Sequence, residues 1–504
     1  MTAPTPIKAR SDEADLQPDG MVSRGDDHGA HSVSERCLQA VAWAYLVLLP
    51  LDIRLHGPLF LHDLLAPILA LLILDRRTWT RLRRLPFCAL PAFLAVGAFA
   101  TAAHARAPVD FYEPAIFAYM AVLFLAFVRF SPRPAHLALY AALVLTAMLC
   151  HSLGEILVGM RRSYAIYEGS SLAFIARRYF FTFEHPNLAG SFYILPVSCL
   201  LMAYCLSGLK LKRNGVISAA ILSLVACIPL MLTVSRHMMI SIFSICVFFM
   251  DEMRSSYNRY MRRIIKPFML SIFTLFYLTI LVPFFPLKAQ FPYINVSTVG
   301  MYMTHQSIYF RMAMSSFARF ATGLGHTGLH ETYPLFADRS AIHAVLSQYR
   351  QESLTDTFAT YMDAHNEYLN LAVLFGVPAM LLCVAFWVGI GWSAWRRLKL
   401  ESVPATLDEG RLAGPDSSLP DGSRVSAASC RLGRIAERLF EHRVPGTHVN
   451  LAASLTIVLV IGVLLAALWD DILSKRWIWI ALALSVGCLE RCSSSSAQGG
   501  GATE

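Results

Sequence analysis

The sequence predicts an all-α protein: a polytopic integral membrane bundle of about twelve transmembrane helices, with a large, mostly helical loop between helices nine and ten. The chain has 504 residues, of which 56% are hydrophobic and only 15% are charged. A soluble protein carries roughly one-quarter charged residues. The mean hydropathy is +0.51, and the apolar residues gather into runs of about 20, the length at which a helix spans a bilayer. An ordinary soluble globule is therefore excluded.

Cysteine usage and net charge narrow the class further. The 11 cysteines are odd in number and scattered, and most lie within apolar runs. No CxxC pair or cysteine–histidine spacing predicts a metal site, so we expect these residues to be small buried hydrophobes. The formal net charge of +9 is explained by lysine and arginine collecting in cytoplasmic loops. It requires no nucleic-acid partner.

The chain divides into two polar tails and one long apolar domain. Residues 1–35 are polar, are rich in Asp, Gly and Ser and contain no apolar core segment. We expect a disordered tail there, not a signal peptide. Residues 36–492 hold all the apolar runs and form the membrane-embedded domain. Residues 493–504 are expected to be a second disordered tail.

Windows of about 20 apolar residues predict the membrane spans. The eighth and twelfth runs are short, which suits helices that are tilted, re-entrant or extended by neighbouring residues. The predicted spans are about 38–54, 58–75, 85–103, 111–130, 135–158, 186–207, 214–233, 237–250, 264–284, 366–392, 449–469 and 476–490.

Basic residues predict the orientation of these helices. Clusters follow the second, sixth and eighth runs, on the same side as the N-terminal tail. Because lysine and arginine favour cytoplasmic loops, this side is assigned to the cytoplasm, and both termini lie there. The basic loop 395–447 falls on this side too, with an interfacial helix expected around residues 431–442. The clusters are Arg76, Arg77, Arg81, Arg83, Arg84; Lys210, Lys212, Arg213; and Arg254, Arg259, Arg262, Arg263, Lys266.

Two outward segments, 159–185 and 285–365, are too long to be simple turns, and long segments without a linker composition are usually functional. The second shows helical periodicity around residues 308–320 and 340–358. We expect it to form a small, mostly helical cap. Within it, Gly323 and Gly325 signal a turn and not a nucleotide loop, because no strand precedes them.

Arginines on the outward side are the most informative departure from the charge rule. Arginine carries a rigid fork of donors that suits phosphate oxygens, and a lipid pyrophosphate at the outer surface would meet that requirement. Two interpretations are open for each residue, because long loops largely escape the charge rule and tolerate solvated arginines. The outward arginines are Arg161, Arg162, Arg177, Arg178, Arg236, Arg311, Arg319, Arg339 and Arg350.

Arg236 and His365 are the strongest candidates for functional residues. Arg236 lies between two apolar runs with almost no loop around it, so it either reaches headgroups or binds a phosphate in a cavity. His365 lies where the outer loop leads into the tenth span, and a neutral imidazole there can accept a proton from a sugar hydroxyl. The alternative is a capping role. Asn366 and Glu367 likewise suit the start of a helix without catalysis.

The segment from Arg178 to Gly190 is the third candidate. Pro186 stands near a helix start, followed by Asn187 and by the small residues Ala189 and Gly190, which allow close backbone approach. Tight helix packing explains Pro186, Ala189 and Gly190 at least as well as substrate contact does. Asp63, an acid within the second span, is expected to face the bundle with a partner, and it remains a functional candidate because acids inside a membrane are costly.

Together these segments resemble the O-antigen ligase and polymerase superfamily of bacterial envelope glycosyltransferases. The resemblance rests on the order of several motifs within residues 178–378, and the architecture matches over roughly residues 40–490. Phe181 and Glu184 stand where the family often has glycine, and His185 where asparagine is usual, so the local turn is expected to differ. The matching segments are 178–187 (RYFFTFEHPN), 233–236 (TVSR), 309–311 (YFR), 323–325 (GLG), 364–369 (AHNEYL) and 375–378 (FGVP).

The resemblance implies transfer of a glycan from an undecaprenyl-pyrophosphate carrier to an acceptor sugar, at the periplasmic face of the bacterial inner membrane. The acceptor would be lipid A-core or a growing glycan, and no metal or other cofactor is implied. By the same resemblance, Arg236 and Arg311 hold the pyrophosphate and Arg178 assists. His365 would activate the acceptor hydroxyl or assist the leaving group, with Asn187, Asn366 and Glu367 in support.

Two other functions stay open. A transporter or flippase of lipid-linked oligosaccharide would need charged sites or broken helices at the membrane centre, and often repeat symmetry. Here the ionisable residues concentrate at the outer boundary, which favours an enzyme. A sensor or assembly scaffold would have no requirement for His365. The residues alone do not separate a ligase from a polymerase, because both use the same donor.

Overall fold

The structure is a computed structural model. It describes residues 27–56, 59–83, 87–158, 181–183, 186–207, 209–211, 213–233, 241–242, 244–246, 296–347, 355–401, 440–442, 447–468 and 472–499. These residues are mostly helical, as the composition predicts. The expected span 264–284 lies outside the described residues, as do most of span 237–250, of segment 159–185 and of loop 395–447.

The N-terminal part of the bundle consists of apolar helices and a few short helical turns. A small hairpin of β1 and β2 follows the first helix and pairs antiparallel. The elements are α1 (Asp27–Leu48), η1 (Leu49–Leu51), β1 (Arg54–His56), β2 (Leu59–Phe60), η2 (Leu61–Leu65), α2 (Ala66–Ile73), α3 (Arg76–Leu82), α4 (Ala89–His104), η3 (Pro108–Phe111), α5 (Tyr112–Arg129), α6 (Pro134–Val158), α7 (Pro186–Phe192), α8 (Ile194–Ser207), β3 (Leu209–Leu211) and α9 (Arg213–Thr233).

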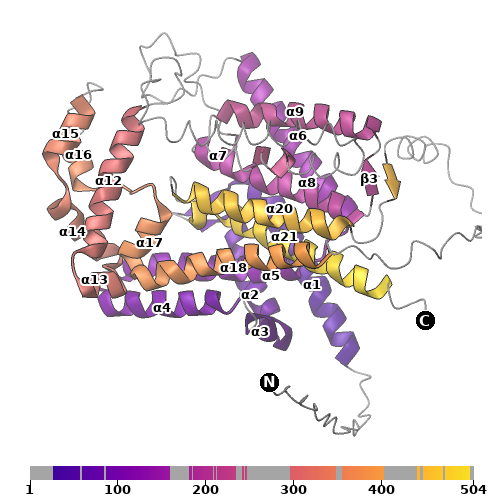
Figure 1. The fold of residues 1–504 in the computed structure, drawn as a ribbon, viewed down its shortest axis with the longest axis horizontal. Helices are drawn as coiled ribbons and strands as arrows, with labels where there is room; N and C mark the ends of the chain where they lie inside the picture. Colours follow the sequence, from indigo (N-terminus) through magenta and orange to yellow (C-terminus); the bar gives the residue numbers. More distant parts are fainter. Residues whose placement is uncertain are drawn as a thin grey trace, which may run out of the picture.

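The C-terminal part contains five helices that we call the cap, α12 to α16, followed by the remaining helices of the bundle. In Figure 1 the cap covers the left end of the molecule, and α12 runs across the direction of the long bundle helices. The elements are α12 (Val296–Met314), α13 (Phe317–Thr322), α14 (Gly325–Phe336), α15 (Arg339–Ser347), α16 (Thr355–Thr360), α17 (Glu367–Phe375), α18 (Val377–Glu401), β4 (Phe440–His442), α20 (Thr447–Ala466), η8 (Ile472–Ser474) and α21 (Arg476–Gly499).

Five described helices are long and apolar enough to cross a membrane by length and composition, so a bundle of membrane-spanning helices is supported while the count of twelve is not. Three shorter apolar helices, 61–73, 89–104 and 217–229, coincide with further predicted spans. The five candidate spans are Pro108–Arg129, Pro134–Gly154, Leu188–Ser207, Val377–Lys399 and Val449–Ala466.

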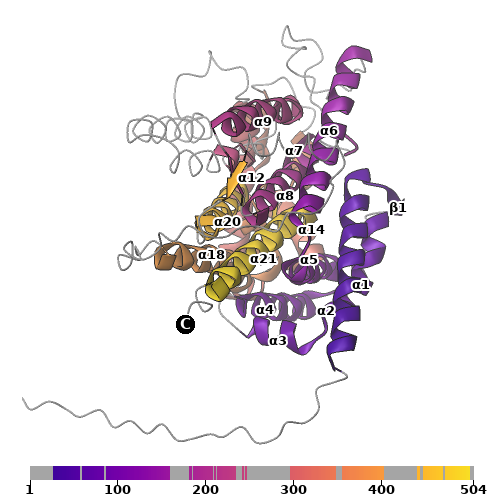
Figure 2. The ribbon, with the colours of Figure 1, turned by 90° about the vertical axis from the view of Figure 1, so that its right-hand side faces the viewer.

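Helix α21 lies at the centre of the bundle and contacts both α5 and α8 (Figure 2). Aromatic side chains fill the space around it. The rings of Phe386 and Trp479 stack with centroids 5.8 Å apart, and those of Phe124 and Phe386 meet edge to face at 5.1 Å. Gly487 allows close approach to α5, since a Cβ there would lie 2.7 Å from the carbonyl oxygen of Val128.

The structure corrects the predicted ends of the domain. Helix α1 begins at Asp27, so residues 27–35 are helical and do not belong to a disordered tail. Glu35 accepts a hydrogen bond from Arg129, 2.9 Å away, which ties this extension to α5. At the other end α21 continues to Gly499, where Arg397 donates to the hydroxyl of Ser493 at 3.1 Å. These polar contacts extend helices past the apolar stretches from which the boundaries were predicted.

Two short antiparallel strand pairs, β1 with β2 and β3 with β4, accompany the helices without changing the helical fold class. One further prediction needs correction. The predicted span 366–392 is divided into α17 and α18 at Gly376, which has φ 87°. A Cβ there would lie 2.6 Å from the carbonyl carbon of Ala321, so a cap helix packs against the break.

The cap is mostly helical within its described residues, as predicted for 285–365. Gly323 (φ 71°) and Gly325 (φ 69°) form the predicted turn between α13 and α14. A side chain at Gly323 would collide with the backbone of Leu374, 2.6 Å away. Asp110 accepts a hydrogen bond from the backbone N–H of Thr327 at 2.7 Å, which fastens the start of α14 to η3. These contacts seat the cap on η3 and on the end of α17.

Candidate active site

His365 lies in the loop 361–366, where the cap joins the bundle. Its backbone has φ 46°, in the left-handed region that non-glycine residues rarely adopt. The Asp363 carboxylate accepts a hydrogen bond from the His365 backbone N–H at 3.4 Å and another from the Asn370 side chain at 2.9 Å. The loop is therefore held by its own polar residues, and a strained backbone of this kind is a reason to suspect function.

The two residues after His365 begin α17. Asn366 caps the helix by accepting a hydrogen bond from the backbone N–H of Leu369 at 3.1 Å, as its capping interpretation predicts. Glu367 is buried in the first turn, and its backbone N–H donates to the carbonyl of Ala467 at 2.9 Å. This bond connects the His365 loop to the end of α20. Both residues position the loop.

Histidine and tyrosine side chains of the cap surround this loop. The Tyr309 hydroxyl donates to the carbonyl of Met362 at 3.3 Å, and Tyr333 donates to the carbonyl of Phe358 at 3.2 Å. The buried His305 ring shares a hydrogen bond with the Tyr333 hydroxyl. These bonds run from α12 and α14 to the backbone on either side of Tyr361, so the cap fixes where His365 stands.

Burial keeps two ionisable side chains at the loop, His305 and Tyr361, in their neutral forms. Burial, with a smaller contribution from the charge of His365, lowers the pKa of His305 to about 4. Burial raises the pKa of Tyr361, and the carboxylates of Asp363 and Glu113 raise it as well, against a hydrogen bond with Tyr309 that lowers it. His305 is thus neutral at pH 7. The carboxylate of Glu113, at the start of α5, lies close enough to influence the loop.

Arg311 lies on the opposite side of α12 from Tyr309, with its side chain exposed. Its guanidinium donates to the carbonyl of Phe336 at 3.1 Å, at the C-terminal end of α14. Hydrogen bonds from Ser340 lower the pKa of Asp338, and the charge of Arg311 lowers it further. Arg311 therefore contacts the junction of α14 and α15. His365 instead contacts Asp363 and influences the pKa of His305.

Two predicted phosphate ligands, Arg178 and Arg236, lie outside the described residues. Asn187 is the second residue of α7, but its side chain is outside the description as well. Just before α7, Phe181 has φ 58°, the conformation that glycine adopts without strain. The turn is therefore left-handed even though a phenylalanine stands where the resembling family often has glycine.

A second polar cluster was only half predicted. Asp63, which was expected to face the bundle with a partner, forms an ion pair with Arg476 at 2.9 Å. It also accepts hydrogen bonds from the Tyr119 hydroxyl at 2.6 Å and from the backbone N–H of Phe60 at 2.9 Å. The Arg476 guanidinium stands 4.7 Å from the centre of the Phe60 ring. We call this set the Asp63–Arg476 network.

Sequence analysis missed Arg476, although a signal existed. Arg476 and Asp63 each stand near the outward end of a predicted span, so opposite charges are placed at one level of the bundle. The guanidinium also contacts the His62 ring. Because a guanidinium only donates hydrogen bonds, the ring nitrogen of His62 accepts, and His62 is neutral although it lies 3.5 Å from Asp63.

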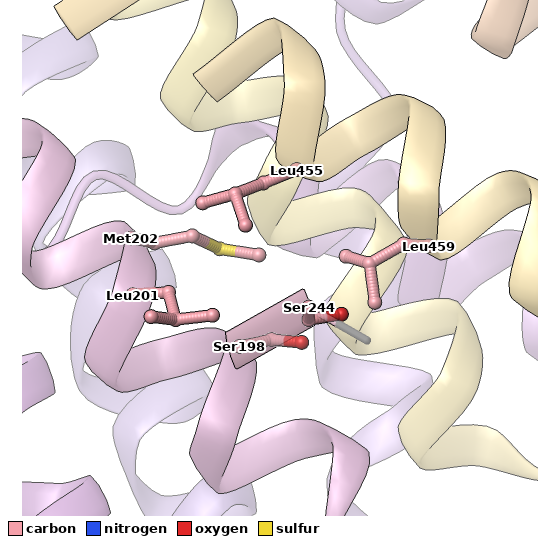
Figure 3. Close-up of a pocket in the computed structure, with 6 residues that line it drawn as sticks. All are labelled: Ser198, Leu201, Met202, Ser244, Leu455 and Leu459. Carbon is pink, nitrogen blue, oxygen red and sulfur yellow. The ribbon is translucent and has the colours of Figure 1, made fainter. Parts of the chain in front are cut away.

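The described residues contain neither a metal-binding cluster nor a cavity that could hold a ligand in the recess between α8 and α20. Among the described residues, no group of three or more His, Cys, Asp or Glu side chains could hold a metal ion. Figure 3 shows a recess between α8 and α20 that has no room for a water molecule, so it is a packing defect within the bundle. It is lined by Ser198, Leu201, Met202, Ser244, Leu455 and Leu459.

Comparisons with known proteins supply no assignment. No protein-family model matches this chain, and a search of curated proteins gives no match either. The chemistry available to the molecule therefore follows from its side chains and their arrangement.

Proposed function

We propose that this chain is a glycosyltransferase of the periplasmic face, which transfers a glycan from an undecaprenyl-pyrophosphate carrier to an acceptor sugar. The acceptor is lipid A-core in an O-antigen ligase, or a growing glycan in a polysaccharide polymerase. One observation carries the proposal: His365 is held in a left-handed backbone conformation, by Asp363 and Asn370, where the cap meets the bundle. A histidine fixed in this way suits proton transfer.

The proposed reaction is a displacement at the anomeric carbon of the donor sugar. The His365 imidazole accepts the proton of the acceptor hydroxyl, and the oxygen of that hydroxyl forms a bond to the anomeric carbon. The bond from that carbon to the pyrophosphate oxygen breaks, and the electron pair leaves with the pyrophosphate. Guanidinium groups stabilise the charge that develops there. Arg236 and Arg311 take this role, with Arg178 assisting.

Arg311 has donors to spare for this role. A guanidinium carries five N–H groups, and the bond to Phe336 uses only one of them. The neutral state of His305 supports the role of His365 as well, because a charged imidazole next to it would disfavour protonation of His365 during the reaction.

The experiment compares surface glycan from a deletion strain complemented with single variants. We expect His365→Ala, Arg236→Lys and Arg311→Lys each to reduce transfer at least about tenfold, because lysine does not replace a bidentate guanidinium. His343→Ala and Arg339→Lys, exposed positions of the cap, are matched controls and should leave transfer unchanged. Immunoblots of the membrane fraction verify insertion. Unchanged glycan length and lipid-A capping in all three site variants would refute the proposal.

Gel electrophoresis of the surface glycan from the deletion strain distinguishes a ligase from a polymerase. Loss of the polymer ladder in the deletion strain indicates a polymerase, because no long chains are made. A normal ladder that stays detached from lipid A-core indicates a ligase, because chains are made but not transferred. Purified protein in vesicles with the lipid-linked donor then shows whether the acceptor gains the mass of a glycan.

A transporter of lipid-linked oligosaccharide is the second candidate. The Asp63–Arg476 network is the buried charged pair that bears on it, although both residues stand near the ends of their predicted spans and not at the centre, where a transport site would lie. Charged side chains buried among membrane helices often mark a transport path. A transporter moves the donor across the bilayer without forming a glycosidic bond. In the vesicle experiment it would therefore change the side on which the donor is found and leave the mass of the acceptor unchanged.

A further inference from the structure

An exposed apolar patch lies along one edge of the cap. Its members are Phe310, Met314, Phe317 and Leu335, with exposed fractions of 57%, 51%, 85% and 80%. The opposite face of α12, which carries Ile308, Tyr309 and Met312, is buried against the rest of the cap. The cap therefore packs through the opposite face of α12 and leaves the patch residues uncovered. Large apolar side chains gathered at a surface mark an interaction site.

Two arginines belong to this patch. Arg311 donates to the carbonyl of Phe336, next to Leu335, at 3.1 Å. Arg319 donates to the hydroxyl of Ser315 at 2.8 Å, and its guanidinium stands 5.7 Å from the centre of the Phe336 ring. These contacts bring α12, α13 and the end of α14 together at one place. The patch therefore combines large apolar side chains with cations that suit phosphate groups.

The level of the patch coincides with the end of the shorter apolar helix α4 and with the start of the candidate membrane span in α18. His104, the last residue of α4, forms a hydrogen bond of 2.7 Å with Thr322 at the end of α13. Gly323 packs against the backbone of Leu374, just before the candidate span that starts at Val377. Figure 1 shows α13 beside the ends of α4 and α18. Helix α13 thus stands where the bundle leaves the apolar layer.

The lipid-facing surface of the bundle continues toward this patch. Phe99 on α4 is 69% exposed and Leu381 on α18 is 56% exposed, and both helices contact α13. A surface helix with large apolar residues and flanking cations lies in the boundary between headgroups and acyl chains. A protein partner would explain the apolar residues, but it would not explain their continuity with the lipid-facing surface.

We infer that this edge of the cap docks on the outer leaflet of the bilayer. The side chains of Phe310, Met314, Phe317 and Leu335 enter the boundary of the acyl chains, and Arg319 binds lipid phosphate, with Arg311 beside it. The cap, and the His365 loop that it holds, then keeps a constant height above the membrane. The inference shares Arg311 with the proposed enzymatic function, but it rests on Arg319 and on the four apolar side chains, which that function does not use.

The test measures how fast an introduced cysteine reacts with a charged maleimide that does not enter bilayers. Full-length Phe317→Cys and Leu335→Cys proteins are reconstituted into vesicles of equal parts phosphatidylcholine and phosphatidylglycerol. His343→Cys, on an exposed position of α15, is the control. Peptide mass spectrometry reads each site separately, so the native cysteines do not interfere. Both patch positions are highly exposed in the protein itself, so slow labelling would have to come from lipid.

We expect labelling at positions 317 and 335 to be at least about tenfold slower than at position 343, because the patch lies below the headgroups. Adding Arg319→Glu to Phe317→Cys should speed labelling in these anionic vesicles. Equal rates at the patch and control positions would overturn the inference. So would protection found in native membranes but absent from lipid vesicles, since the occupant would then be a protein.

Discussion

Removal of the Asp63 carboxylate should destabilise the bundle more than any exposed charge does. The side chains of Asp63 and Arg476 are only 11% and 17% exposed, and Asp63 accepts three hydrogen bonds, from Arg476, Tyr119 and Phe60. Asp63→Ala leaves the Arg476 charge buried without its counter-ion, which costs about 3–5 kcal/mol. At about 2 °C per kcal/mol for a large domain, the thermal midpoint should fall by about 6–10 °C.

The chain supplies its own probe for this measurement. Cys199, Cys383 and Cys488 are fully buried, so a thiol-reactive dye reports their exposure as the detergent-solubilised protein is heated. The control is Arg106→Gln, which breaks an ion pair with Glu331 whose members are 66% and 56% exposed. An exposed pair contributes at most about 1 kcal/mol, so the midpoint should move by no more than about 2 °C.

A double-variant cycle separates the ion pair from other effects of the substitutions. Arg476→Met removes the cation that Asp63→Ala leaves unpaired, so the double variant should be more stable than the sum of the two single losses predicts. Equal midpoints for Asp63→Ala and Arg106→Gln, or strict additivity in the cycle, would refute the assignment of a stabilising buried network.

Three further predictions concern the core, the cap and the candidate site. Gly487→Ala should lower the thermal midpoint, because the new Cβ meets the Val128 carbonyl at 2.7 Å, whereas Gly154→Ala, with no neighbour within 4 Å, should not. The lowered pKa of His305, about 4 against an ordinary 6.5, means that the unfolded chain binds the extra proton first; stability should fall by up to about 3 kcal/mol as the pH drops from 6.5 to 4. His305→Phe should flatten that pH profile of the thermal midpoint, whereas His343→Phe should not. Asp363→Ala should reduce glycan transfer more than Asp363→Asn, because only asparagine keeps an oxygen for the bonds that hold the His365 loop; equal losses on glycan gels would contradict this positioning role.

Much of the architecture could be predicted because its signals are local. Runs of apolar residues predicted α5, α6, α8, α18 and α20, and helical periodicity predicted a helical cap. The predictions failed where contacts between distant segments decide the outcome. The tail prediction for residues 27–35 was wrong because Glu35 is held by Arg129. The span 366–392 was predicted as one helix because its hydropathy does not show that a cap helix packs against Gly376.

The candidate site divides in the same way. Asn366 could be predicted as a cap residue because capping depends on the next few residues alone. The left-handed backbone of His365 and the neighbouring neutral His305 could not be predicted, because both follow from how α12 and α14 pack around the loop.

By itself, the sequence determined that this chain is helical and that it carries apolar helices long enough for a bilayer. It also predicted that ionisable residues gather near one end of these helices. These properties follow from hydropathy summed along the chain, which needs no knowledge of neighbours in space. Only the tertiary structure decided that Asp63 meets Arg476, 413 positions along the chain, and that tyrosines of the cap hold the His365 loop. The physical reason is that the energy of a buried charge or a strained loop depends on the groups that surround it, and those come from helices far apart in the sequence.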